Sequence, residues 1–180
     1  PTSTAVQIMV KDGSIDMHTG HGATVNTTNG SIALENINGP VNAATESGDV
    51  TADNITGPLA VSASSGSLRI DQIKGQVEAK TFSGDVVARS TVLSGNSLLQ
   101  TQNGSVRFDG SLDSHGSYRM QTTSGDVDLT LPANAAFALD ASTGSGTVQN
   151  AFGTGSTGNT PRPSLFLHTQ NGSINVVKGL

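Results

Sequence analysis

Glycine recurs at every ninth position through the first half of the chain. Glycines stand at positions 30, 39, 48, 57, 66, 75 and 84. A fixed period of this kind is typical of repeat architectures. A single repeat cannot bury its apolar face alone, and it buries that face by stacking on the neighbouring repeats. The spacing therefore predicts a repeat protein, and it constrains the fold more than any other feature of the sequence.

The nine-residue segments are of two alternating kinds, so the complete repeat has 18 residues. In both kinds the second and fourth residues after the glycine are apolar, as in Ile32 and Leu34, and the residues between them are polar or small. This period of two indicates a short strand with one buried face. The first kind is "GSIALENIN", "GDVTADNIT" and "GSLRIDQIK", and the second is "GPVNAATES", "GPLAVSASS" and "GQVEAKTFS".

Each strand is expected to begin at a sharp corner, because glycine enters positive φ without a steric penalty. Two strands and two corners per 18 residues describe one coil of a parallel β-helix, or β-solenoid, whose successive coils pair in parallel about 4.8 Å apart. We expect an all-β chain with one domain over residues 1–180, about eight coils, and an irregular surface loop at 152–164. The expected turn glycines are Gly30, Gly39, Gly48, Gly57, Gly66, Gly75, Gly84, Gly104 and Gly125.

A column of amides is expected at one corner. Asn36, Asn54 and Gln72 share one phase of the repeat, and an isoleucine follows each of them. An amide carries both a donor and an acceptor, so stacked amides can form a hydrogen-bonded ladder.

The composition argues against several classes of partner. Charged residues make up 13% of the chain, about half the usual share. The net charge of −5 and the scattered nine Lys and Arg residues provide no patch that would neutralise a phosphate backbone, so no nucleic-acid partner is expected. No apolar run is long enough to span a membrane, and the first residues lack the features of a signal peptide. The absence of cysteine excludes disulfides and thiolate chemistry.

Three acidic residues are the binding candidates. Glu35, Asp53 and Asp71 share one outward phase in three consecutive coils, so their carboxylates should form a column. One interpretation is a cation site, or a pair of acids at the separation of about 5–5.5 Å that retaining glycosidases use. The other, which we favour, is a solvated acidic stripe relieved by Arg69 and Lys74.

The other candidates for chemistry are weaker, and we expect no metal, no cofactor and no catalytic residue. Asp49, Asp85 and Asp126 alternate with serines at one phase, which keeps carboxylates out of adjacent coils and does not match a calcium-binding nonapeptide repeat. The histidines have no third ligand fixed beside them, and exposed turn positions are expected for them. They are His18, His21, His115 and His168.

The second half carries a family resemblance. The stretch "NGSVRFDGSLDSHGSYRMQTTSGDVDLTLPANAAFALDASTGSGTV", residues 103–148, runs from a G-S-V strand through an aromatic strand at Tyr118 to SGDV, a Leu-Pro pair, an apolar strand and a closing S-G. In this order it resembles the bacterial putative-adhesin family of β-strand-repeat domains. The resemblance implies an extracellular or envelope-associated protein and brings no catalytic or ligand residues.

Three functions are compatible with these observations. The first is a non-catalytic surface module whose flat faces bind a cell-surface or envelope polymer or protein. The second is a structural subunit that stacks end to end into a fibre, because exposed strand edges invite further strands and neither terminus shows a cap helix. The third and least favoured is a polysaccharide-active enzyme using the acidic column, since a chain with one Tyr and no Trp offers few platforms for sugars.

Overall fold

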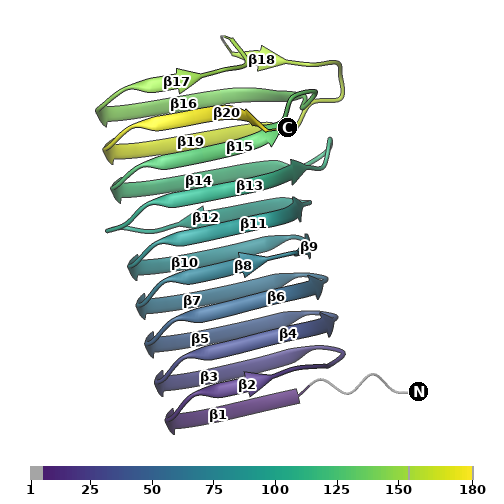
Figure 1. The fold of residues 1–180 in the computed structure, drawn as a ribbon, viewed down its shortest axis with the longest axis vertical. Helices are drawn as coiled ribbons and strands as arrows, with labels where there is room; N and C mark the ends of the chain where they lie inside the picture. Colours follow the sequence, from purple (N-terminus) through teal and green to yellow (C-terminus); the bar gives the residue numbers. More distant parts are fainter. Residues whose placement is uncertain (1–5, 154, 180) are drawn as a thin grey trace.

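The chain folds as a β-solenoid, as the repeat predicts. The computed structural model describes residues 6–153 and 155–179, whose regular elements are all β-strands. The strands form two ten-stranded sheets that run along the stack, with the apolar core between them. Each coil contributes a strand to one sheet, turns, and contributes the next strand to the other sheet (Figure 1).

The strands of each sheet are parallel to their neighbours, with one antiparallel exception at the end of the first sheet. In spatial order, sheet A holds β1 (Val6–Asp12), β3 (Ala23–Asn29), β5 (Val41–Ser47), β7 (Leu59–Ser65), β10 (Val77–Ser83), β12 (Asn96–Gln100), β14 (Ser117–Ser124), β19 (Ser164–Asn171), β16 (Phe137–Ser145) and β18 (Ser156–Thr157). Sheet B holds β17 (Val148–Asn150), β20 (Ile174–Gly179), β15 (Val127–Pro132), β13 (Val106–Leu112), β11 (Val86–Leu93), β8 (Leu68–Asp71), β6 (Val50–Thr56), β4 (Ile32–Asn38) and β2 (Ile15–Met17), with β9 (Lys74–Gly75) paired to β11 and β6.

The core consists of aliphatic rows that run from coil to coil. Val50, Leu68 and Val86 are register partners on neighbouring strands of sheet B, and each is fully buried. The other inward positions of the repeat, among them Ile32 and Leu34, are buried in the same way. Each strand of the repeat thus places two apolar side chains between the sheets, and their burial is the main favourable term in the folding of the stack.

Glycine is required at the corners by the close approach of successive coils as well as by backbone conformation. Gly66 has φ +153°, and a Cβ built on it would overlap the carbonyl oxygen of Gly48 one coil earlier. The same collision recurs along the column, so each corner glycine lies directly against the backbone of the one before it. All nine glycines that the sequence predicts at turns have positive φ.

Buried threonines satisfy the carbonyl groups of this glycine column. Thr45 Oγ1 donates to the Gly30 carbonyl at 3.1 Å, and Thr81 Oγ1 donates to the Gly66 carbonyl at 2.9 Å. Thr27, Thr101, Thr122, Thr143 and Thr169 make the same bond to glycines of neighbouring coils. A buried carbonyl without a partner would cost free energy, so these hydroxyls allow the corner to close without water.

One coil lacks the threonine, which provides a test of its contribution. Ala63 occupies the position between Thr45 and Thr81, next to the Gly48 carbonyl. We expect Ala63→Thr to raise the free energy of unfolding by about 1 kcal/mol, because the new hydroxyl would reach that carbonyl. Ala63→Val, which has the same shape without the hydroxyl, should give a smaller gain in urea unfolding. Equal gains for the two variants would contradict this role of the threonines.

The residue after the corner glycine forms a second ladder along sheet B. Ser31 Oγ accepts the Asp49 amide N–H at 3.3 Å, and Asp49 Oδ1 accepts the Ser67 amide N–H at 2.7 Å. The alternation continues through Asp85, Ser105, Asp126 and Ser173. The recurring Ser-Gly-Asp-Val therefore has two causes: carboxylates stay out of adjacent coils, and each side chain accepts a hydrogen bond from the next coil.

The last two coils do not stack in chain order, which corrects the expectation that successive coils pair throughout. β14 pairs with β19, and β19 pairs in turn with β16. In the other sheet β20 lies between β15 and β17. The chain therefore skips one position, forms the outermost coil β16–β17, and returns to insert the coil β19–β20 beneath it, as the yellow strands in Figure 1 show.

The apolar content of the two coils explains this order. An outermost coil leaves one side of its inward residues uncovered, so the coil with larger apolar side chains gains more from the inner position. Inward residues of β19–β20 are completely buried, whereas those of β16–β17 that follow the buried Phe137 are half-buried or exposed. The former are Leu165, Leu167, Ile174 and Val176, and the latter are Leu139, Ala141, Val148 and Asn150.

The stretch 152–164, expected as an irregular surface loop, contains a short strand. Within it β18 pairs antiparallel with the start of β16. Phe152 packs edge-on against Phe137, with ring centroids 5.2 Å apart, and Lys178 lies over the Phe152 ring. This segment thus covers part of the outermost coil, β16–β17. Residue 154 lies outside the described residues.

Candidate functional site

The predicted acidic residues do stand in one column. Glu35 on β4 is the register partner of Asp53 on β6, and Asp53 is the partner of Asp71 on β8. Since parallel strands lie about 4.8 Å apart, the three carboxylates follow one another along the outer side of sheet B. The repeat phase was sufficient to predict this arrangement.

Basic groups flank the column at both ends. His18 Nδ1 lies 3.0 Å from Glu35 Oε2, and the His18 side chain is largely exposed whereas that of Glu35 is partly buried. Arg89 on β11 is the register partner of Asp71. The Asp53 carboxylate lies between the two other acids, and its Oδ1 is buried without a hydrogen-bond partner among the described residues. The sequence suggested Arg69 and Lys74 as neutralising groups; Arg69 is registered with Thr51 and Val87, Lys74 is registered with Thr56 and Val92, and their effect on the acids stays a prediction.

The column offers limited chemistry. In the described part of the chain no three His, Asp or Glu side chains are placed to hold a metal ion. The three acids follow a sheet face, and they line none of the hollows described below. Their role as a binding site stays a prediction.

The corner beside the column has the expected amides. Asn36, Asn54 and Gln72 all have φ between 51° and 55°, a left-handed conformation that Asn tolerates better than most residues. Asn54 Nδ2 donates to Asn36 Oδ1 at 2.6 Å, which forms the first step of the predicted ladder. The isoleucines that follow, Ile37, Ile55 and Ile73, are fully buried. The left-handed residue lies between the acid and the isoleucine, and the bend that it makes lets the acid point outward and the isoleucine inward.

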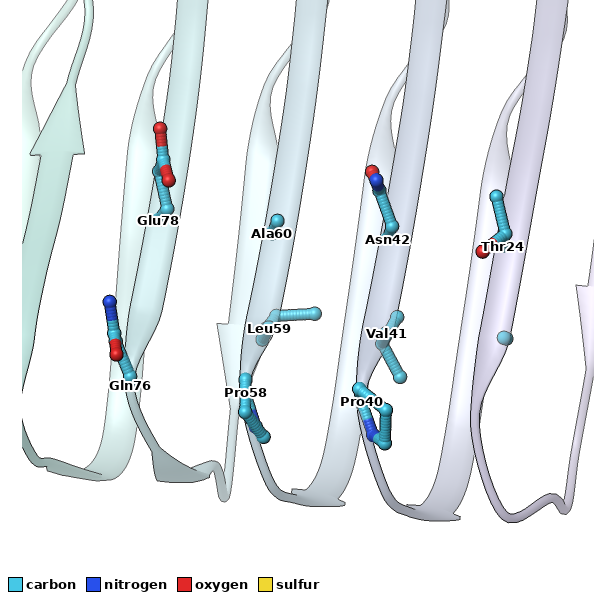
Figure 2. Close-up of a pocket in the computed structure, with 10 residues that line it drawn as sticks. Thr24, Pro40, Val41, Asn42, Pro58, Leu59, Ala60, Gln76 and Glu78 are labelled. Carbon is cyan, nitrogen blue, oxygen red and sulfur yellow. The ribbon is translucent and has the colours of Figure 1, made fainter. Parts of the chain in front are cut away.

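The outer face of sheet A carries two shallow hollows over its first five strands. The first lies along the start of the strands and is lined by residues that include Pro40, Pro58, Ala60 and Glu78. Thr24, Asn42, Ala60 and Glu78 stand side by side on four adjacent strands, and Figure 2 shows the short Ala60 between the longer Asn42 and Glu78. The absence of side-chain volume at Ala60 produces the hollow.

The second hollow continues the first along β3, β5 and β7 and extends to β1. Its centre is formed by Asn26, Ala44 and Ser62, which are register partners. Charged groups stand only at its edge, where Lys11 and Glu46 lie. Beyond β7 the outer face of sheet A is charged, because Glu78 and Lys80 form an ion pair on β10. The uncharged area therefore ends at β10.

The histidines occupy exposed positions, as expected, and their described contacts are with polar neighbours close to them in the fold, among them Asp113 beside His115. His115 Nδ1 lies 2.9 Å from Ser114 Oγ, and His168 Nδ1 lies 3.0 Å from Ser142 Oγ. The contact of His168 with Ser142 spans the inserted coil and the outermost coil, so it was not visible from sequence spacing.

Tyr118, the single tyrosine, has a structural position. Its ring is completely buried in the row of Ser97 and Leu165, and its hydroxyl donates a shared hydrogen bond to the carbonyls of Leu93 and Asp113, each at 2.9 Å. Burial, with a smaller contribution from the nearby Asp113 carboxylate, raises the pKa of Tyr118 to about 12. The phenol therefore keeps its proton at neutral pH and fixes the corner at residues 113–116.

Comparison with known families agrees with this architecture. The chain matches the family described as Toastrack DUF4097 over residues 1–176. It belongs to the Toastrack family. Toastrack domains are solenoid repeat domains of unknown function. None of the curated proteins and none of the solved structures compared with the chain matches it.

The family confirms the coarser part of the resemblance noted in the sequence, namely a β-strand-repeat domain with no assigned function. Within residues 6–153 and 155–179 this Toastrack chain has no helix long and apolar enough to cross a membrane.

Proposed function

We propose that this Toastrack domain is a non-catalytic, adhesin-like module that acts at the bacterial cell surface or envelope and binds an envelope polymer or protein through the outer face of sheet A. The observation that carries the proposal is the pair of adjoining hollows over β1, β3, β5, β7 and β10. The bacterial and extracytoplasmic parts of the proposal rest on the family resemblance of residues 103–148.

The chemistry of this face favours a flat, weakly charged ligand. Ala44, Ala60 and Ser62 leave the backbone of the sheet accessible, and Asn42 offers both a donor and an acceptor. The proline rings of Pro40 and Pro58 add an apolar border. Because the strands are rigidly paired on both sides, binding here costs little ordering of the protein.

A matched pair of substitutions tests the proposed face. Ala60→Arg fills the first hollow, and Ala33→Arg places the same side chain on the outer face of sheet B, where Ala33 is flanked by Asp16 and Thr51. We expect the wild-type protein to sediment with peptidoglycan sacculi or with purified surface polysaccharide. We expect Ala60→Arg to lose at least about tenfold in affinity, roughly 1.4 kcal/mol, and Ala33→Arg to bind as the wild type does. Equal binding by the two variants, or no binding by the wild type, would refute the proposal.

End-to-end assembly into a fibre is a second candidate, which the structure favours at one end only. Among the described residues β1 pairs with β3 alone, and Met9 on β1 is 73% exposed. At the opposite end β18 covers part of β16. A strictly monomeric rod in light scattering at high concentration would remove this candidate.

Hydrolysis of a polysaccharide by Asp53 and Asp71 has the weakest support, because neither acid lines one of the hollows described. If the column were catalytic, Asp53→Asn and Asp71→Asn would abolish hydrolysis.

A further inference from the structure

The inserted coil β19–β20 is held between two coils: β16–β17, to which residues 151–163 connect it, and β14–β15, to which the chain does not connect it directly. On one side Thr169 Oγ1 donates to the Gly125 carbonyl, and the Ser173 amide donates to Asp126 Oδ1. On the other side Thr143 Oγ1 donates to the Gly172 carbonyl, and the Gly172 amide donates to the Ser145 carbonyl at 2.9 Å. The coil is therefore held in the slot between β14–β15 and β16–β17 by the same kinds of hydrogen bond that join successive coils elsewhere in the solenoid.

Side chains on the outer faces add contacts that are specific to this slot. Arg119 on β14 lies over the Phe166 ring, 5.4 Å from its centroid. Asn175 Nδ2 donates to Asp128 Oδ1 at 2.9 Å. These contacts come from residues on β14 and β15, so they depend on the slot and not on how the coil is tethered.

The tether contributes little to the docking. The coil is joined to β17 by residues 151–163, which are mostly exposed and rich in Gly, Thr and Pro. The contacts between this connection and the coil that it carries include Lys178 over the Phe152 ring. Because no other described coil follows it in chain order, the coil can leave its slot without breaking the continuity of the other described coils.

We propose that the coil of residues 164–179 is an exchangeable element, and that the slot between β14–β15 and β16–β17 is an interaction site for the same coil of a second copy. Exchange of an identical element between protomers is a low-cost route to a dimer, because every contact in the slot is retained. This inference does not depend on the proposed ligand of sheet A.

The connection sets the conditions under which exchange occurs. A short tether holds its own coil at an effective concentration on the order of mM. The monomer is therefore favoured in dilute solution, and a second copy competes for the slot only when chains fold together at comparable concentration. Exchange should depend on the concentration during refolding and not on simple mixing of folded protein.

Cysteine cross-linking tests the exchange directly, since the natural chain has no cysteine. Gln121 on β14 and His168 on β19 are register partners on the outer face. Neighbouring strands place Cα atoms within the range that a disulfide bridges. We would unfold Gln121→Cys and His168→Cys as separate proteins, mix them in urea, refold at concentrations from about 10 μM to the mM effective concentration, and oxidise. The expected result is a disulfide-linked heterodimer whose share rises at least about fivefold across the series.

The control pair is Asn42→Cys with Ala60→Cys. These residues are register partners on β5 and β7, which no exchange of the last coil can separate. This mixture should give only the background of random collisions at every concentration. A double variant carrying Gln121→Cys and His168→Cys in one chain should form an intrachain disulfide at low concentration, which confirms that the coil docks in the substituted protein. If that intrachain bond forms but the heterodimer stays at the control level, the exchange is refuted.

Discussion

Gly66→Ala is expected to destabilise the domain by roughly 4 kcal/mol or more, a loss that few single substitutions cause. The new Cβ would overlap the Gly48 carbonyl, which belongs to the backbone of the preceding coil and has no rotamer to change. Since the coils on both sides are hydrogen-bonded in register, relief would require two coils to separate locally. Urea unfolding followed by far-ultraviolet circular dichroism would measure the loss.

Gly153→Ala is the control that separates collision from backbone conformation. Gly153 also has positive φ, +100°, but an added Cβ would have no atom within 4 Å. Its substitution should cost about 1–2 kcal/mol, the penalty for an L-residue in this region. A comparable loss for both variants would show that conformation alone, and not the stacking of glycines on backbone, makes the column necessary.

Leu99→Ala is expected to cost about 2–5 kcal/mol, because it leaves a cavity between the sheets. Leu99 on β12 is 1% exposed, whereas the preceding residue, Leu98, points to the outer face of sheet A and is half-buried. Leu98→Ala should therefore cost less than about 1 kcal/mol. The two variants delete the same atoms from adjacent residues, so the comparison tests the inward and outward assignment of the strand.

Thermal or urea unfolding of these two leucine variants would measure both losses. A larger loss for Leu98→Ala than for Leu99→Ala would contradict the assignment of faces.

The period of nine residues was sufficient to predict most of the fold. It placed Val50, Leu68 and Val86 in one buried row, the isoleucines at one corner, and Glu35, Asp53 and Asp71 in one column, because each depends only on phase within the repeat. The place of a residue within its repeat can be read from the local sequence. In a stack of parallel strands in register, residues at the same place in successive repeats lie side by side.

The order of the last coils could not be predicted in this way. Both final coils carry the same glycine and strand pattern, so phase does not distinguish their positions. The distinction lies in the size of the inward side chains, as in Leu167 against its partner Ala141 and Val176 against Asn150. The sizes of these side chains indicate the order of the coils, but only when the apolar surface buried in each of the two possible stacking orders is compared.

The threonine and serine ladders were missed for another reason. The hydroxyls of Thr45 and Thr81 face the interior and satisfy glycine carbonyls, a role that the strand pattern alone does not indicate. A polar residue at an inward phase, repeated from coil to coil, was the sign that the corner carbonyls needed partners.

The inserted coil has a consequence for synthesis on the ribosome. A nascent chain emerges from its N-terminus, and the coils up to β14–β15 can each dock as soon as they appear, since each rests on the one before. The segment of β16 and β17 must wait, because its place exists only after residues 164–179 have been made. Completion of the domain is thereby linked to completion of translation of this region, and a prematurely terminated chain would keep an unfinished, strand-accepting end.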